Sequence, residues 1–258
     1  MSRKNRSRAR VIRGAFLLAP LALGVSSALA APVPGGTLDP LSIPKYVTPL
    51  VIPPVLFDDG AAPMAVSVAL RQFQQQVLPA QDVAGNPLPP TTLWGYCDGS
   101  QPGTTTCNNP AYTFEVTRNT TTTVTWVNDL VDVNGNFLTH IIRDNDGDPA
   151  TVDDPIIDQT LHWANPPQEC VSGIPRTDCH GISGDPYVGP IPMVTHVHGA
   201  HVGPISDGYP EAWWLPAASN IPAGYATQGT FYDDINGGSP DTGTAVYQYT
   251  NDQPSTTL

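Results

Sequence analysis

Beyond its first 30 residues, the sequence has little positive charge and no long apolar run. The whole chain of 258 residues carries 11 Lys and Arg against 23 Asp and Glu. Residues 1–30 hold six of the basic residues and none of the acidic ones, so the remainder has five basic against 23 acidic residues, a net charge of −18. Such an acidic surface repels nucleic acid and anionic lipid, which excludes both as partners. Metal cations remain compatible with it.

Residues 1–30 have the pattern of a signal peptide. Basic residues are followed by the apolar run 15–25 and then by Ala28-Leu29-Ala30, an A-x-A cleavage signal. The run is too short to span a bilayer, and no other follows it. The sequence therefore predicts cleavage near Ala30 and a secreted or periplasmic protein without a membrane anchor.

Cysteine is scarce, and no C-x-x-C spacing of a metal site is present. The four cysteines form two close pairs, Cys97 with Cys107 and Cys170 with Cys179. In an oxidising compartment, four cysteines allow three disulfide connectivities, of which the local one closes two short loops. Metal ligation is the alternative, but the spacing favours disulfides.

Sustained helical periodicity is also missing, whereas proline and glycine interrupt the whole chain. Residues 31–63 contain eight prolines and are expected to form an extended arm. The domain proper is then predicted over 64–258, without a visible internal repeat. Alternating or β-branched runs predict strands near 65–70, 113–116, 121–127, 193–198 and 245–249. Short strands between long loops favour an all-β antiparallel sandwich or barrel.

The clearest chemical motif is Thr195-His196-Val197-His198-Gly199. On a strand, residues i and i+2 face the same side with Cα atoms roughly 7 Å apart, which suits two adjacent metal ions. Imidazole binds copper, zinc and iron, and Gly199 would let the backbone turn away close to the metal. The alternative is a pair of half-buried histidines that make ordinary hydrogen bonds.

The surroundings of this motif resemble a known family. Residues 192–214 read PMVTHVHGAHVGPISDGYPEAWW, in which 206–213 match Ser-Asp-Gly-Tyr-Pro-Glu-Ala-Trp of the multicopper oxidases, in the branch of spore-coat laccases and bilirubin oxidases. The segments 93–96 (LWGY), 110–116 (PAYTFEV) and 38–54 are similar to other parts of the same family. The resemblance covers nearly the whole chain after residue 30.

The resemblance implies a cupredoxin-like Greek-key β-sandwich that binds copper. By this likeness His196 would bind a type 2 copper, and His198 would bind one of the type 3 pair. Asp207 would assist proton delivery during the reduction of oxygen to water, a task that suits a carboxylate. A plain turn role for Asp207, before Gly208, is the alternative. The reducing substrates implied are phenol-like, bilirubin-like or metal-ion compounds.

The chain also departs from the family. Multicopper oxidases gather eight histidines from four His-x-His motifs on two domains, and they need a Cys flanked by histidines for the type 1 copper. This chain has one such motif, and its cysteines lie in no such setting. In the family, the strand resembling 246–258 leads into Trp-Tyr-His-Asp-His. We therefore expect an incomplete domain, inactive alone, whose partners are the missing cupredoxin domains and molecular oxygen.

The remaining candidate residues have plainer interpretations. His201 is expected to be no ligand, His140 to be structural, and His162 and His180 to be solvated. The acidic loop 144–154 lacks the spacing of a calcium-binding loop and is expected to be solvated. Two rival functions remain: a non-catalytic secreted copper-binding or interaction domain, and a zinc hydrolase using His196, His198 and His201, for which the motif lacks a carboxylate ligand.

Overall fold

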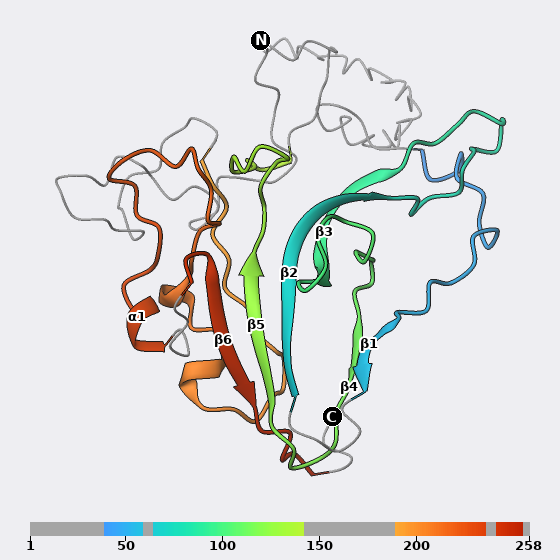
Figure 1. The fold of residues 1–258 in the computed structure, drawn as a ribbon. Coiled ribbons are helices and arrows are strands. Elements are labelled where there is room, and N and C mark those ends of the chain that lie inside the picture. The colour runs from blue at the N-terminus through green and yellow to red at the C-terminus, as the bar shows by residue number, and fades with distance from the viewer. Residues whose placement is uncertain (1–38, 59–63, 142–188, 236–240, 255–258) are drawn as a thin grey trace, which may run out of the picture. The chain divides into compact units, whose positions relative to one another are not determined.

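The computed structural model describes residues 39–58, 64–141, 189–235 and 241–254 (Figure 1). The predicted signal peptide, Cys170, Cys179, His162, His180 and the acidic loop 144–154 all lie outside these residues. The boundaries expected for the arm and the domain therefore stay predictions. Within the described part of the chain, no helix has the length and apolar character needed to cross a membrane.

The fold is all-β, in agreement with a cupredoxin-like sandwich. A four-stranded sheet has the order β3-β2-β5-β6 (Figure 1), and a two-stranded sheet pairs β1 with β4. Helical structure in the described residues is limited to α1 (Tyr232–Ile235) and two 3-10 turns, η1 (Pro204–Ser206) and η2 (Pro210–Ala212). The strands are β1 (Val55–Asp58), β2 (Met64–Gln75), β3 (Thr91–Asp98), β4 (Thr113–Glu115), β5 (Thr122–Asn128) and β6 (Thr244–Tyr249).

The expectation of purely antiparallel sheets was wrong. The pairs β2–β3 and β5–β6 are antiparallel, but β2–β5 and β1–β4 are parallel. Parallel neighbours need a long connection that returns the chain to the same end of the sheet. Here β3 and β4 lie in that connection between β2 and β5.

Four of the predicted strands correspond to β2, β4, β5 and β6, whereas β3 was not predicted. Gly95 interrupts the residue alternation of β3 and has a packing reason. A Cβ on Gly95 would lie 2.9 Å from Cε1 of Phe73 on the neighbouring strand β2. The glycine therefore leaves room for the Phe73 ring, although it hides the strand in the sequence.

The main buried cluster lies on one face of the four-stranded sheet and also holds the chain that carries the histidines. Alternate residues of β5 are buried, from Thr122 to Asn128. The buried Asn128 side-chain amide donates hydrogen bonds to the carbonyls of Ile191 (2.9 Å) and Trp214 (3.1 Å). These bonds tie the 189–214 segment to the sheet. The main buried cluster comprises Val68, Val124, Trp126, Met193, Trp214, Tyr232, Ala245 and Tyr247.

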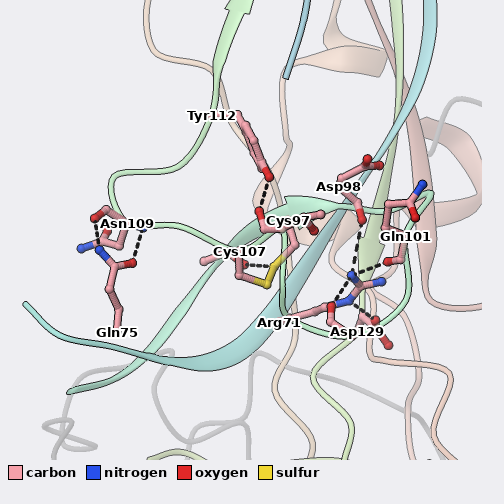
Figure 2. The surroundings of a disulfide bond; sticks show 12 residues. Arg71, Gln75, Cys97, Asp98, Gln101, Cys107, Asn109, Tyr112 and Asp129 are labelled. Carbon is pink, nitrogen blue, oxygen red and sulfur yellow. Dashed lines mark hydrogen bonds and ion pairs between the residues drawn. A yellow bond between two sulfur atoms is a disulfide. The ribbon is translucent and has the colours of Figure 1, made fainter. Parts of the chain in front are cut away.

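A disulfide joins Cys97, at the end of β3, to Cys107 (Figure 2). The two cysteines are 10 residues apart, so the bond closes the short local loop that the sequence had suggested. Cys97 is fully buried. The Tyr112 hydroxyl donates to the carbonyl of Thr106, beside the disulfide. This loop is therefore fixed both covalently and by hydrogen bonding.

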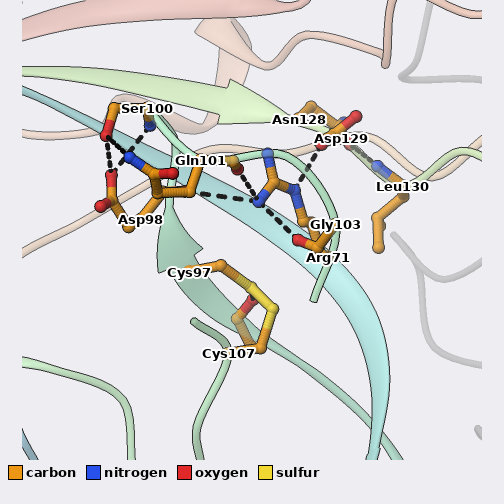
Figure 3. Close-up of polar contacts among 11 residues, drawn as sticks. Arg71, Cys97, Asp98, Ser100, Gln101, Gly103, Cys107, Asn128, Asp129 and Leu130 are labelled. Atoms are coloured by element: carbon orange, nitrogen blue, oxygen red, sulfur yellow. Dashed lines mark hydrogen bonds and ion pairs between the residues drawn. A yellow bond between two sulfur atoms is a disulfide. The ribbon is translucent and has the colours of Figure 1, made fainter. Parts of the chain in front are cut away.

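Arg71 of β2 organises the chain between the two cysteines (Figure 3). Its Nε lies 2.5 Å from the Asp129 carboxylate, and its Nη1 donates to the carbonyls of Gln101 and Gly103, both at 2.8 Å. The guanidinium side chain is only 11% exposed. One cation thus connects β2 to the disulfide loop and to the residue after β5.

Two loops share the motif Asp-Val-x-Gly-Asn, at 82–86 and 132–136, although no internal repeat was predicted. In each, one carboxylate oxygen accepts two backbone N–H bonds at 2.8–2.9 Å, and the other contacts the Asn side chain. Accepting these bonds lowers the pKa of both carboxyls; the Asn86 side chain contributes most for Asp82 and the Asn136 N–H for Asp132. Both loops are turns of the scaffold, and the second is half-buried at Asp132 and Asn136.

Candidate metal site

The His-x-His motif does not lie on a strand, contrary to the prediction for 193–198. Met193 pairs with Trp214 through two backbone hydrogen bonds of 2.8 and 2.9 Å, as an isolated bridge. Beyond Met193 the backbone is irregular and reaches a turn at His198 and Gly199. The strand pattern fails because this segment pairs with a loop that carries two 3-10 turns and offers no continuous strand partner.

The two imidazoles nevertheless lie side by side. The ring centroids of His196 and His198 are 5.2 Å apart, with the ring planes at 65°. Both residues are exposed, with 46% of the His196 side chain open to solvent. Gly199 follows with φ +74°, so the backbone turns away after His198, as expected for a glycine there. The arrangement presents two neighbouring nitrogen donors at the surface of the described fold.

His196 is oriented by the loop that contains Asp207. Its Nδ1 lies 2.5 Å from the Asp207 carbonyl oxygen and 3.4 Å from the Asp207 carboxylate. A carbonyl can only accept, so Nδ1 donates this hydrogen bond, and in the neutral ring the lone pair is then on Nε2. This is the form in which a histidine binds a metal, with the other ring nitrogen held by a backbone carbonyl. The donor set therefore fits copper, for which imidazole is a suitable ligand.

The 206–208 loop is packed closely on the backbone of the motif. The buried Ser206 hydroxyl accepts a hydrogen bond from the Gln248 N–H of β6 at 2.9 Å. Gly208 has φ +79°, and a Cβ there would come within 1.9 Å of the Thr195 carbonyl oxygen. Only glycine satisfies both the left-handed backbone and this close approach. The Ser-Asp-Gly segment thus acts as a spacer between β6 and His196.

Asp207 lies at a turn, beside the His196 ring. It ends η1 as its C-cap and so occupies a turn position. Its carboxylate lies next to the His196 imidazole, and its negative charge also acts on the Tyr249 hydroxyl. Burial is the main cause that raises the pKa of Tyr249 to about 12, and the negative charge of Asp207 raises it further. Whether this carboxylate transfers protons stays a prediction.

An apolar pocket of about 210 Å³ lies beside His198. Phe114 of β4, Trp126 of β5 and Tyr249 of β6 contribute its aromatic wall. The Trp126 indole N–H donates to the Tyr249 hydroxyl at 3.1 Å. His201 also lines this pocket.

The other histidines in the described residues have separate partners. His201 Nδ1 lies 2.9 Å from the Asp252 carboxylate, and this hydrogen bond is the main cause that lowers the Asp252 pKa. His140 stacks on Trp94 with ring centroids 5.9 Å apart. Among the residues that the structure describes, no three His, Cys, Asp or Glu side chains are grouped to hold a metal. In the described fold, a three-histidine zinc site is therefore not formed.

The sequence did not indicate two of the contacts around the site, the one between His201 and Asp252 and the one between Ser206 and Gln248. Asp252 lies 51 residues after His201, and Gln248 lies 42 residues after Ser206. No local pattern marks either pair, because only the return of the chain along β6 brings them together.

Comparison with known proteins gives two relatives, although no protein-family model matches the chain. A laccase of Haloferax volcanii is 27% identical over 215 residues, covering 81% of this chain and 29% of that protein. A laccase of Bacillus subtilis is 28% identical over 174 residues, covering 67% of this chain and 24% of that protein. The chain thus spans less than a third of the length of these relatives. The two similarities support a relationship of the multicopper oxidase kind.

Proposed function

We propose that this chain is a cupredoxin-like part of a secreted, laccase-like multicopper oxidase. In this proposal it contributes His196 and His198 to a trinuclear copper cluster. In this proposal, the remaining copper ligands come from other cupredoxin domains. These domains would correspond to the part of the relatives that lies outside the matched segment. The observation that carries the proposal is the pair of adjacent imidazoles, with His196 held in its metal-binding form by the Asp207 carbonyl.

Bound copper would supply one-electron chemistry, by which oxidation of a reducing substrate is coupled to the reduction of oxygen to water. The residues of this chain have narrower tasks. The Asp207 carbonyl orients His196, and the Asp207 carboxylate, 3.4 Å from the imidazole, is half exposed and so can exchange protons with solvent. Two protein ligands do not complete such a cluster, so the isolated chain is expected to bind copper without oxidase activity.

The direct test is titration of the 258-residue chain with Cu(II), followed by electron paramagnetic resonance. Nitrogen hyperfine coupling from imidazole is expected, with His196 and His198 each supplying one nitrogen to bound Cu(II). His196→Ala and His198→Ala should each remove one nitrogen, and the double variant should abolish binding. His162→Ala is the matched control, since this histidine was predicted to be solvated. Unchanged binding by the double variant would contradict the copper site.

A second test concerns the source of the missing ligands. The source gene can be sequenced beyond codon 258, together with its neighbours, for Trp-Tyr-His-Asp-His and a later His-Cys-His. Finding them in frame, after a frameshift or in an adjacent gene would support the oxidase. If they are absent and Cu(II) still binds, the non-catalytic copper-binding domain becomes the better account.

A further inference from the structure

The loop after His198 is bonded to a segment that lies about 50 residues later in the chain, which we define as residues 250–253. The Gln253 side-chain amide donates to the Gly199 carbonyl at 2.7 Å. The Thr250 hydroxyl lies 3.1 Å from the His201 carbonyl, and the His201 ring lies 2.9 Å from the Asp252 carboxylate. Hydrogen bonds from the 250–253 segment thus hold both the backbone of this loop and the His201 side chain.

The 250–253 segment is itself fixed to the sheet. The Asn251 side-chain amide donates to the Thr120 carbonyl at 2.7 Å and to the Thr122 hydroxyl at 3.0 Å, at the start of β5. The Asn119 N–H donates to the Asn251 carbonyl at 2.9 Å. Asn251 has φ +53°, a left-handed conformation that asparagine tolerates better than most residues. A continuous set of bonds therefore runs from β5 to the loop beside His198.

His198 depends on this support more than His196 does. The Asp207 carbonyl holds the His196 ring directly. Within the described residues, no hydrogen bond to the His198 ring is found, and its recorded ring contact is with His196. The backbone consequently sets where the His198 side chain begins and which region its imidazole can reach, and the bonds at Gly199 and His201 constrain that backbone.

We propose that the 250–253 segment positions His198, and that His201 acts through Asp252 as a positioning residue instead of a metal ligand. This inference rests on the proposed function, because it takes His198 to be a metal ligand. His201 has 76% of its side chain exposed, and its Nδ1 is engaged by Asp252. Within the described fold it joins no group of three metal-binding side chains. Its role is to connect two loops.

The first experiment needs no metal. Proton–carbon NMR spectra of the histidine rings are recorded for the 258-residue chain and for Asp252→Ala, Asp252→Asn and, as matched control, Asp82→Ala. Asp252→Ala should broaden or shift the His198 signal while the His196 signal stays in place. Asp252→Asn should restore it, because the amide oxygen still accepts from His201. Asp82→Ala removes another exposed hydrogen-bonding carboxylate and should leave both signals unchanged.

The second experiment measures Cu(II) affinity and nitrogen hyperfine coupling of His201→Ala and His201→Gln. Loss of positioning should weaken Cu(II) binding about tenfold in His201→Ala, the size of effect typical of outer-shell partners. His201→Gln can still donate to Asp252 and should bind close to wild type, with the same number of coupled nitrogens. A lost nitrogen in His201→Gln, or an unmoved His198 signal in Asp252→Ala, overturns the inference. If wild type binds no Cu(II), the proposed function fails, and the NMR result alone decides on positioning.

Discussion

Two regions of the molecule are held together by different means. The disulfide region, comprising Arg71, residues 97–107 and Asp129, contains a covalent bond and a largely buried cation with several acceptors (Figures 2 and 3). The histidine region, residues 195–208, has irregular backbone and exposed imidazoles, and hydrogen bonds to β6 and to the 250–253 segment hold it in place.

This difference predicts that the stability of the fold depends mainly on the disulfide region and that metal binding depends mainly on the histidine region. Strong local constraints lie far along the chain from His196 and His198, which are open to solvent. The His196 ring is held by the Asp207 carbonyl, and the loop after His198 is held by hydrogen bonds from the 250–253 segment. Replacements in the disulfide region should therefore lower the free energy of unfolding with little effect on Cu(II) binding. Replacements in the histidine region should change Cu(II) binding and lower the free energy of unfolding by a smaller amount. The following predictions test this contrast, in order of decreasing effect on stability.

Removing the disulfide should have the largest effect. For a loop closed by cysteines 10 residues apart, replacing Cys97 and Cys107 with alanine should lower the free energy of unfolding by about 3 kcal/mol. The reason is that the unfolded chain regains the freedom that the cross-link removes. Guanidinium denaturation measures this loss, and Cu(II) titration of the folded variant should match wild type. A parallel loss of Cu(II) affinity would show that the two regions are coupled.

Replacing the cation should come next. Arg71→Met removes the donor to the Asp129 carboxylate and to the carbonyls of Asp98, Gln101 and Gly103, and should cost about 2 kcal/mol. The estimate is kept below that for a fully buried pair because the Asp129 side chain is 32% exposed. Arg71→Lys keeps the charge but loses the forked geometry, and should lie between Met and wild type in thermal melting. If Arg71→Lys melted like wild type, the forked geometry would be unimportant here; if it melted like Arg71→Met, the charge alone would contribute nothing.

Ser206→Ala should give a smaller loss of stability together with a change at the site. The Gln248 N–H loses its acceptor, at a cost of about 1 kcal/mol, and the loop that orients His196 loses its contact with β6. Urea denaturation and Cu(II) titration measure the two effects. Ser219→Ala is the control, because the exposed Ser219 hydroxyl only donates, to the Gly135 carbonyl and the Asn136 side chain. If Ser206→Ala bound Cu(II) like wild type, His196 would not depend on this contact.

The smallest predicted effect is on the free energy of unfolding at acidic pH. Folding lowers the pKa of Asp82 and Asp132 below the ordinary value of 3.8. A lowered pKa in the folded state means that these carboxylates stabilise the fold above pH 3.8 and that this contribution is lost as pH falls through the lowered pKa. Asp82→Asn and Asp132→Asn should each reduce the acid dependence of urea denaturation below pH 4, leaving Cu(II) binding at neutral pH unaltered. An unchanged acid slope in both variants would contradict the assignment.

Sequence patterns predicted strands well where burial alternates along the chain. Val124 and Trp126 on β5 show this, since one face of that strand is buried and the pattern depends only on neighbouring residues. The same reasoning failed at 193–198, where valine and histidine also alternate but the partner segment is not a strand. It missed β3 because Gly95, needed beside the Phe73 ring, has no side chain to continue the pattern.

For the site, the motif by itself singled out the adjacent histidines and the glycine turn after them. Their neighbours could be found only in three dimensions. Asp207 orients His196 mainly through its backbone carbonyl, a group that every residue has, so no side-chain pattern could reveal it. The Asp252 partner of His201 was equally hidden, because an exposed aspartate after a strand has no distinguishing context in the sequence.

Composition and short-range patterns were sufficient to predict the all-β class, the acidic surface and two neighbouring imidazoles, and they offered the local pairing of Cys97 with Cys107 among several alternatives. These follow from composition and from contacts between residues close in the chain. Tertiary structure alone decided the parallel pairing of β2 with β5, the irregular backbone around His196, and the bonds from β6 and the 250–253 segment. Such features depend on which distant segments meet, and that is set by the burial of Trp126, Trp214 and Tyr247 in one core.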